Sequence, residues 1–284
     1  MKTGFIGLGT MGSAMVERLM AEKTELAVWN RTPAKATRLG LVPVEFPTQL
    51  LAECEIVILN LFDSAAVSAV LTGNNGLLTG DCRGKTIIDT TTNHFKDVLA
   101  FHGLCHGKGA VYLEAPVLGS VVPASKGTLT IVVSGQVDAF IKVSPLLEKL
   151  GQHIFHLPEP GQATRMKLVN NLLLGTFMTS IAEAIVIGER AGIEKEKVLD
   201  ILAVGAGNSG VLSAKRQKLL DEDFSVHFSA AAIYKDLHFL QDLSRELKRP
   251  LFTGSLAKEI FAMVAANDMD KLDFSVVYKI LKEL

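Results

Sequence analysis

The sequence predicts an α/β domain with a mainly parallel sheet, followed by an all-α domain and joined to it by a long interdomain helix. Two observations carry this prediction. Up to His156, short β-branched segments alternate with helical patterns, which is typical of βαβ units. After Gly161, only helical patterns follow. The chain of 284 residues has room for two domains at roughly 100–200 residues each.

The expected strands of the first domain are short and apolar. Continuous apolar segments favour a sheet that is covered by helices on both faces. The expected strands are Thr3–Ile6, Leu26–Trp29, Ile56–Asn60, Thr86–Asp89, Val111–Glu114, Thr128–Val133 and His153–His156. The helical segments between them are Met11–Ala21, Pro33–Leu39, Ala65–Leu71, Lys96–His106 and Val137–Leu147.

The domain boundary is expected where two prolines and a glycine interrupt the pattern, at residues 158–161. We therefore assign residues 1–161 to the first domain and 162–284 to the second. One helix is predicted over Gln162–Arg190, with Gly192 as its C-cap. It is unusually apolar, so we expect it to be buried, in part by a second subunit. The helices expected after it are Glu194–Ala203, Val211–Leu220, Ser229–Leu247, Ser255–Ala266 and Asp273–Leu281.

Composition excludes several classes of protein. The chain is 48% hydrophobic and 21% charged with a net charge of −1, which excludes a disordered protein and disfavours a nucleic-acid binder. Because no uninterrupted apolar segment reaches ~18 residues, no membrane-spanning helix is expected. Three cysteines are too few for a disulfide scaffold and lack metal-ligand spacing. His102 and His106, four residues apart, are interpreted as a solvated helix face, and no metal is expected. We predict a cytoplasmic protein.

A glycine fingerprint points to a dinucleotide. Gly7, Gly9 and Gly12 match G-x-G-x-x-G directly after the first strand and at the start of the first helix. The first glycine permits a tight turn, the second lets a pyrophosphate approach the backbone, and the third lets the helix pack on the strand. The sequence therefore predicts a Rossmann domain. The residues of this turn assigned to the cofactor are Gly7, Leu8, Gly9, Thr10, Met11 and Gly12.

The end of the second strand selects the cofactor. An NAD enzyme usually places an acidic residue there, on the ribose 2′-hydroxyl. This chain has Asn30, Arg31 and Thr32 instead. Asn30 does not repel a 2′-phosphate, Arg31 offers a planar cation, and Thr32 adds a hydroxyl donor. We expect NADP(H), against the alternative that Arg31 is an ordinary surface residue.

A lysine near the start of the long helix is a candidate catalytic residue. Lys167 lies among apolar residues, and Asn171 follows one turn later on the same face. Burial of a lysine is costly without partners and lowers its pKa, which suits proton transfer near neutral pH. The alternative is a lysine whose stem covers an apolar face while its charge reaches water.

Five segments together resemble the β-hydroxyacid dehydrogenase family, which includes 3-hydroxyisobutyrate dehydrogenase and the glyoxylate/succinic semialdehyde reductases. The resemblance extends over essentially the whole chain. The segments are Gly7–Gly12 with Met15, Asp89–Thr92, Glu114–Ser120 followed by Gly127–Leu129, Gly161–Asn171, and Lys235–Leu237.

The resemblance implies a role for each matching residue. It implies Lys167 as general acid/base, with Asn171 either orienting it or binding the same substrate oxygen. It also implies that Ser120 and the Gly119 backbone N–H hold a substrate carboxylate. Phe228 is expected to form an apolar wall. Lys235 is expected near cofactor and substrate, held by Asp236. The remaining residues assigned to the cofactor are Leu61, Phe62 and Thr92, together with Lys235 and Asp236.

One departure leaves the substrate open. Leu118 stands where the family commonly has serine, which removes a hydroxyl that could bind a carboxylate, and Ser120 replaces a common glycine. The leading hypothesis is an NADPH-dependent reductase of a small carboxylated aldehyde or keto acid such as glyoxylate or succinic semialdehyde. The alternatives are a 3-hydroxyisobutyrate-type alcohol dehydrogenase, an imine reductase-like enzyme and an NADPH-binding sensor. The resemblance also implies a homodimer or homotetramer.

Overall fold

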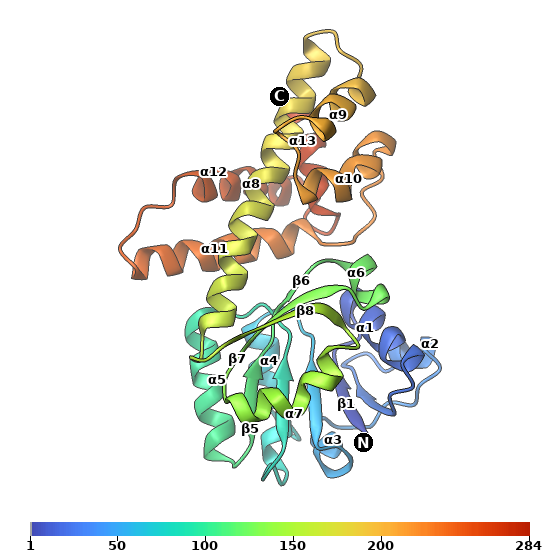
Figure 1. Ribbon diagram of the computed structural model, residues 1–284, viewed down its shortest axis with the longest axis vertical. Coiled ribbons are helices and arrows are strands. Elements are labelled where there is room, and N and C mark those ends of the chain that lie inside the picture. The colour runs from blue at the N-terminus through green and yellow to red at the C-terminus, as the bar shows by residue number, and fades with distance from the viewer. Residues whose placement is uncertain (1) are drawn as a thin grey trace. The chain divides into compact units, whose positions relative to one another are not determined.

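A computed structural model describes residues 2–284 and divides into two compact units. The first unit ends at Lys167 and the second is Leu168–Leu284. The first contains the sheet and the second is helical (Figure 1). The predicted order, an α/β domain followed by an all-α domain, is therefore confirmed.

The first unit is built on one eight-stranded sheet, with strand order β2-β1-β3-β4-β5-β7-β6 and β8 beside β7. The pairs among β1 to β5 are parallel, whereas β7 runs antiparallel to β5 and β6. Because β1, β3 and β4 end in register, the loops that follow them meet at one edge of the sheet. The strands are β1 (Thr3–Ile6), β2 (Leu26–Trp29), β3 (Ile56–Leu59), β4 (Thr86–Asp89), β5 (Val111–Glu114), β6 (Val117–Leu118), β7 (Leu129–Ser134) and β8 (Gly151–Leu157).

Helices cover both faces of this sheet, as the continuous apolar strands predict. Side chains alternate along each strand: Phe5 and Ile58 belong to one buried cluster with α1 and α7, while Ile6 and Val57 belong to another with α3, α4 and α5. The helices of this unit are α1 (Thr10–Ala21), α2 (Ala34–Arg38), α3 (Thr48–Glu53), α4 (Ser64–Thr72), the 3₁₀ turn η1 (Leu77–Thr79), α5 (Phe95–Gly107), α6 (Val121–Lys126) and α7 (Val137–Leu147).

Four short elements lie outside the predicted pattern: α3, η1, β6 and α6. None exceeds six residues, so neither helical nor strand periodicity can develop over their length. β6 exists because Val117 and Leu118 pair with β7. The strand at Thr128–Val133 is shifted by one residue, to Leu129–Ser134.

The long helix α8 (Gln162–Arg190) has the predicted bounds. It ends where Gly192 adopts φ +85°, and the N–H of Ile193 donates to the carbonyl of Gly188 at 3.0 Å. The other helices of the second unit are α9 (Lys195–Val204), α10 (Gly210–Asp221), α11 (Ala230–Glu246), α12 (Phe252–Ala266), the 3₁₀ turn η2 (Phe274–Val276) and α13 (Val277–Lys282).

The prediction of a single α-helix over Asp273–Leu281 is corrected by the structure. This segment forms as η2 followed directly by α13. Asp273 caps η2 by accepting a hydrogen bond from the Ser275 N–H at 3.2 Å, so a start at this aspartate is correct.

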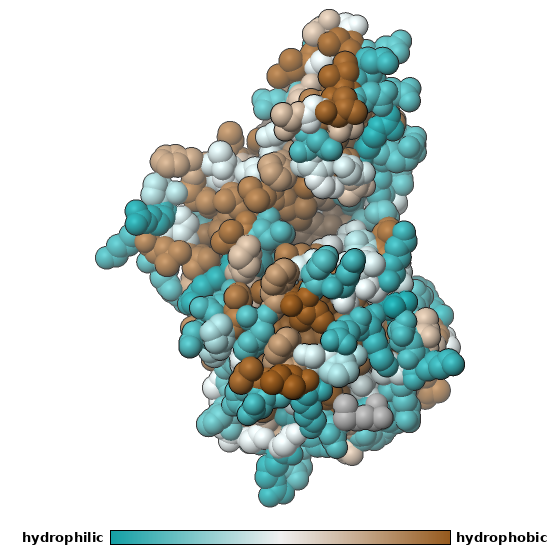
Figure 2. Space-filling model, viewed as in Figure 1, coloured by the Kyte–Doolittle hydropathy of each residue, from teal (hydrophilic) through white to brown (hydrophobic). Residues whose placement is uncertain are grey.

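α8 is apolar enough to cross a membrane by length and composition alone, with a mean hydropathy of 1.5 over its most apolar 18 residues. A helix in the core of a globular protein can be equally long and apolar, and 39% of these 18 residues are buried. Met178, Ile181 and Ile185 pack inside the helical unit. Apolar side chains also gather on the viewed surface of this unit, around α8, α11 and α12 (Figure 2).

Candidate active site

The turn between β1 and α1 has the geometry of a dinucleotide-binding loop. Gly7 has φ +100°, and a Cβ at this position would lie 2.1 Å from the carbonyl oxygen of Asn60. A Cβ on Gly12 would lie 1.9 Å from the carbonyl oxygen of Gly7. Gly9 has nothing within 4 Å of its Cβ position. The first and third glycines are therefore required by packing, whereas the second leaves open space beside the backbone.

The start of α1 can receive an anion. Gly9 is its N-cap and supplies no side-chain hydrogen bond, so the first N–H groups of the helix keep their capacity to bind phosphate. Thr10 is exposed and Met11 is half-buried at this end. Leu8 differs, because its side chain is buried and its N–H already donates to Asn30 Oδ1 at 2.8 Å.

Asn30 joins the glycine turn to the end of β2. Its Oδ1 accepts from Leu8, and its Nδ2 donates to the carbonyl of Thr32 at 2.9 Å. Arg31 and Thr32 are exposed beside it. The edge of the sheet that would face the adenosine ribose thus carries an amide, a guanidinium and a hydroxyl, which fits a 2′-phosphate better than an acidic residue does.

The loops after β3 and β4 are held together at the same edge. The Leu61 N–H donates to Thr91 Oγ1 at 3.0 Å, and Asn60 Nδ2 donates to Thr90 Oγ1 at 2.9 Å. Phe62 is 54% exposed and Thr92 is half-buried. The structure therefore places Leu61 and Thr92, both assigned to the cofactor, on two bonded loops.

Asp89 is buried, and its carboxylate holds together several groups at this edge of the sheet. The sequence pattern assigns it no role of its own. Its carboxylate accepts from the Thr91 N–H at 2.9 Å, from Asn93 Nδ2 at 2.8 Å and from the Tyr112 hydroxyl at 2.5 Å. Burial raises the pKa of Asp89 although these hydrogen bonds oppose the shift. Burial, with the nearby Asp89, also raises the pKa of Tyr112 well above its ordinary value.

Lys167 contacts the segment that precedes the predicted substrate loop, within the first unit. Its side chain is 6% exposed, and Nζ donates to the carbonyl of Val117 at 2.8 Å. Leu118 and Ser120 are half-buried, and Gly119 between them is exposed with φ +131°. A buried ammonium one residue from this loop can donate a proton to a polarised oxygen there.

Asn171, Lys235 and Asp236 form a connected group in the helical unit. Asn171 Nδ2 donates to Asp236 Oδ2 at 2.6 Å, and Lys235 Nζ lies 2.8 Å from Asp236 Oδ1. Asn171 Oδ1 accepts from Asn170 Nδ2 at 3.1 Å. Asn171 and Asp236 are both buried. The expected contact of Asp236 with Lys235 is present, and the aspartate also fixes the amide of Asn171.

Phe228 is half-buried and packs on an aromatic neighbour. Its ring lies edge-on to Phe274 at 5.7 Å between centroids, and its N–H donates to Asp273 Oδ2 at 3.1 Å. This contact fixes the ring. The role of Phe228 as a substrate wall stays a prediction.

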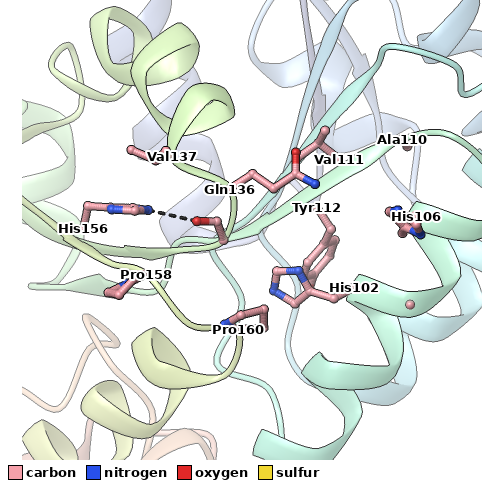
Figure 3. Close-up of a pocket in the computed structure, with 12 residues that line it drawn as sticks. His102, His106, Ala110, Val111, Tyr112, Gln136, Val137, His156, Pro158 and Pro160 are labelled. Atoms are coloured by element: carbon pink, nitrogen blue, oxygen red, sulfur yellow. Dashed lines mark hydrogen bonds between the residues drawn. The ribbon is translucent and has the colours of Figure 1, made fainter.

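A cavity of about 490 Å³ lies elsewhere in the first unit (Figure 3). Its lining includes Tyr112, His156 and Pro160, and it contains none of the residues assigned from the sequence. The solvated-face interpretation is wrong for His102, which also lines the cavity, whereas His106 is exposed. The His102 side chain is only 16% exposed, with Nε2 3.5 Å from Glu114 Oε1. Among residues 2–284, no three His, Cys, Asp or Glu side chains form a metal-binding group.

Comparisons with known proteins identify the family to which both parts of the chain are similar. The profile of the NAD binding domain of 6-phosphogluconate dehydrogenase matches residues 2–158. The profile for NAD-binding of NADP-dependent 3-hydroxyisobutyrate dehydrogenase matches residues 161–281. These two matches follow each other along almost the whole chain, with their junction just before α8.

Two relatives and one solved structure illustrate the likeness. Glyoxylate/succinic semialdehyde reductase 1 of Arabidopsis thaliana is 30% identical, covering 99% of each chain. Mouse cytokine-like nuclear factor N-PAC is 32% identical over 98% of this chain and 50% of its own length. Psf3 in complex with NADP+ and 2-OPP is 28% identical, with a TM-score of 0.91 over 98% of this chain and 99% of that one.

Proposed function

Because the chain belongs to the β-hydroxyacid dehydrogenase family of NAD(P)-dependent oxidoreductases, we propose that it reduces a small carboxylated aldehyde or keto acid with NADPH. The observation that carries the proposal is the buried ammonium of Lys167, bonded to the carbonyl of Val117 beside the loop assigned to the substrate. The substrate class rests on the loop residues that are assigned to a carboxylate, and the reductive direction is part of the proposal.

The cofactor is NADP(H). The open space at Gly9 and the uncapped start of α1 fit the pyrophosphate. Asn30, Arg31 and Thr32 fit the 2′-phosphate, since none carries a negative charge. When bound, NADPH supplies the hydride for the carbonyl carbon of the substrate.

Lys167 acts as the general acid. Negative charge develops on the substrate oxygen during reduction, and a buried ammonium stabilises that charge and then donates its proton to the oxygen. In the oxidative direction the neutral amine accepts the proton. Asn171, one turn further along α8, orients Lys167 or binds the same oxygen. Its own orientation is fixed by Asp236 and Asn170.

The substrate is small and anionic in this proposal. The Gly119 N–H and the Ser120 hydroxyl hold its carboxylate, and Leu118 supplies an apolar contact where a hydroxyl is common in the family. The roles of Phe228 as an apolar wall and of Lys235 beside cofactor or substrate are carried over from the family resemblance. Glyoxylate and succinic semialdehyde are the leading substrates because the Arabidopsis relative bears their names.

Two other enzymes on this scaffold make different predictions. A 3-hydroxyisobutyrate-type dehydrogenase would oxidise a β-hydroxyacid with NADP+ faster than it reduces the semialdehyde. An imine reductase would accept cyclic imines, which lack the carboxylate that the Gly119–Ser120 segment is assigned to hold. A sensor would bind NADPH without turnover of any of these compounds.

A substrate panel tests the proposal. NADPH oxidation is followed by the loss of nicotinamide absorbance with glyoxylate, succinic semialdehyde, tartronate semialdehyde and methylmalonate semialdehyde. We expect saturable turnover of one or two of these acids, and none of the corresponding uncharged aldehydes. Turnover of cyclic imines alone, or of none of the compounds despite tight NADPH binding, contradicts the proposal.

A further inference from the structure

The first turn of α8 is fastened to the sheet by two side chains. The first N–H groups of a helix have no partner inside the helix and need one elsewhere when they are buried. The N–H of Gly161 and that of Thr164 donate to the two carboxylate oxygens of Glu114, the second at 2.9 Å. The N–H of Ala163 donates to Ser134 Oγ at 2.6 Å. Glu114 and Ser134 end β5 and β7, where they pair across the antiparallel register.

The carboxylate of Glu114 is suited to this position by charge as well as by geometry. It is 1% exposed, and a buried charge is costly unless it is paired. A helix N-terminus offers both N–H donors and the positive end of the helix dipole, and a charged acceptor strengthens each hydrogen bond. His102 Nε2 lies 3.5 Å from Oε1, and His102 also lines the cavity in Figure 3.

The same short segment also holds the tip of Lys167. Val117, three residues after Glu114, accepts the hydrogen bond from Lys167 Nζ. Glu114 therefore fixes the start of the helix, and Val117 fixes the ammonium about one helical turn later. A shift of the first turn would move the lysine Cα while its tip stays bonded, so the two contacts together define where the ammonium points.

We infer that Glu114 is a positioning residue for Lys167, which it holds in place through the first turn of α8. This inference rests on the proposed function, in which Lys167 is the proton donor. The hydrogen bonds from Gly161 and Thr164 place the effect of Glu114 on the first turn of the helix that carries Lys167.

Three substitutions test the inference. Glu114→Gln keeps the shape but turns one acceptor oxygen into an N–H donor that faces a helix N–H. Glu114→Asp keeps the charge on a shorter stem. Glu189→Gln is the matched control: Glu189 lies at the other end of α8, where its carboxylate accepts from the Tyr278 hydroxyl at 2.8 Å. Amide hydrogen exchange of the segment 161–168 reports the first turn without any substrate.

We expect Glu114→Gln to lower kcat roughly 10- to 100-fold, the scale that a misplacement of about 1 Å produces, with NADPH affinity unchanged. Amides of 161–168 should exchange faster in this variant and not in Glu189→Gln, and Glu114→Asp should recover part of kcat. Wild-type kcat in Glu114→Gln, unchanged exchange, or an equal loss of NADPH affinity overturns the inference. A wild-type protein inactive on every acid overturns the proposed function instead, and the exchange measurement still decides whether Glu114 fixes this turn.

Discussion

At the scale of single residues, the side chains assigned to the chemistry are few and each has specific hydrogen-bond partners. Asn30 bonds both to the glycine turn, through Leu8, and to its own loop, through Thr32. Lys167 bonds to Val117, and Asn171 bonds to Asp236. Each of these polar groups is held by a defined hydrogen bond, so a substitution at each should have a specific, measurable effect.

Cofactor choice can be inverted at Asn30. In Asn30→Asp, a carboxylate would repel a 2′-phosphate and accept a hydrogen bond from a ribose 2′-hydroxyl. We expect the ratio of kcat/KM for NADPH to that for NADH to fall roughly 10- to 100-fold, since like charges at contact cost several kcal/mol. Arg31→Ala serves as the comparison and should weaken NADPH without improving NADH. An unchanged ratio in Asn30→Asp would remove this residue from cofactor selection.

Residue-scale prediction from sequence succeeds where chemistry is local and stops where it depends on tertiary partners. The glycine turn can be identified from the spacing of its glycines, and Lys167 can be identified because its neighbours in the sequence are apolar. Asp89 and Glu114 give no such signal, because a carboxylate at the end of a strand reads as a surface residue until its buried donors are known. His102 is misread as solvated for the same reason, since nothing in its helix points to Glu114.

At the scale of elements, the turn from β1 to α1 is fixed by packing at two glycines and free at the third. A Cβ at Gly7 or Gly12 would overlap backbone atoms, whereas a Cβ at Gly9 meets no atom. Gly7 and Gly12 are therefore needed to form the turn, whereas Gly9 leaves space for a ligand.

This difference between the glycines makes a paired prediction. Gly9→Ala should leave the thermal midpoint of unfolding unchanged and weaken NADPH binding at least about 10-fold, because the methyl occupies the approach of the pyrophosphate. Gly12→Ala should lower the midpoint, because α1 must move away from Gly7. Calorimetry and NADPH titration check both variants. Tight NADPH binding by Gly9→Ala would show that the phosphates lie elsewhere.

A buried ion pair joins the elements of the helical unit. Asp273 accepts from Lys215 Nζ at 2.8 Å and from the N–H groups of His227 and Phe228 at 3.0 and 3.1 Å. Burial opposes the charge of Asp273, but Lys215 and these hydrogen bonds outweigh it and lower the pKa of the carboxyl. Burial also lowers the pKa of Lys215, which reduces the net gain from the pair.

Because of this ion pair, we expect the folded protein to lose stability at low pH. Because the folded pKa of Asp273 lies below its ordinary value of 3.8, its stabilisation is complete above that pH and is lost as the pH falls through the folded value. Lys215 stays protonated over this range. Asp273→Asn should cost about 3–5 kcal/mol near neutral pH, because it leaves a buried ammonium uncompensated. Circular dichroism during urea unfolding measures it, and a cost under about 1 kcal/mol, the level of an exposed pair, would contradict the account.

Element-scale prediction is most accurate for α8, whose bounds Gln162 and Arg190 follow from a proline-glycine segment before it and Gly192 after it. It misses β6 and α6, because two to six residues cannot display a period. These two elements carry Leu118 and flank Ser120, so the motif Glu114–Ser120 is visible in the sequence, whereas the secondary structure that places its last residues is not.

At the scale of the whole molecule, α8 offers an apolar stripe beyond what its own unit buries. Val169, Leu173 and Phe177, spaced four residues apart, are 45%, 51% and 40% exposed. Residues at this spacing share one face of a helix. An exposed apolar stripe of this kind marks an interaction surface. The predicted homodimer or homotetramer would cover it, and the cytoplasmic location also stays a prediction.

The stripe predicts the assembly. Leu173→Glu places a charge in its centre and should convert the oligomer to a smaller species, measured by light scattering after size-exclusion chromatography. Val42→Glu, at a side chain that is 90% exposed in the first unit, should leave the mass unchanged. A wild-type protein that is monomeric at micromolar concentration would contradict the prediction.

The most direct test of the central claim is the turnover of Lys167→Ala with NADPH bound. The variant removes the buried ammonium and leaves the glycine turn and the Asn30 loop untouched. We predict NADPH affinity within about twofold of wild type and a kcat at least roughly 10²–10⁴-fold lower, the range that a general acid contributes. Wild-type turnover in this variant would contradict the account, because the hydride would then be transferred without a proton from Lys167.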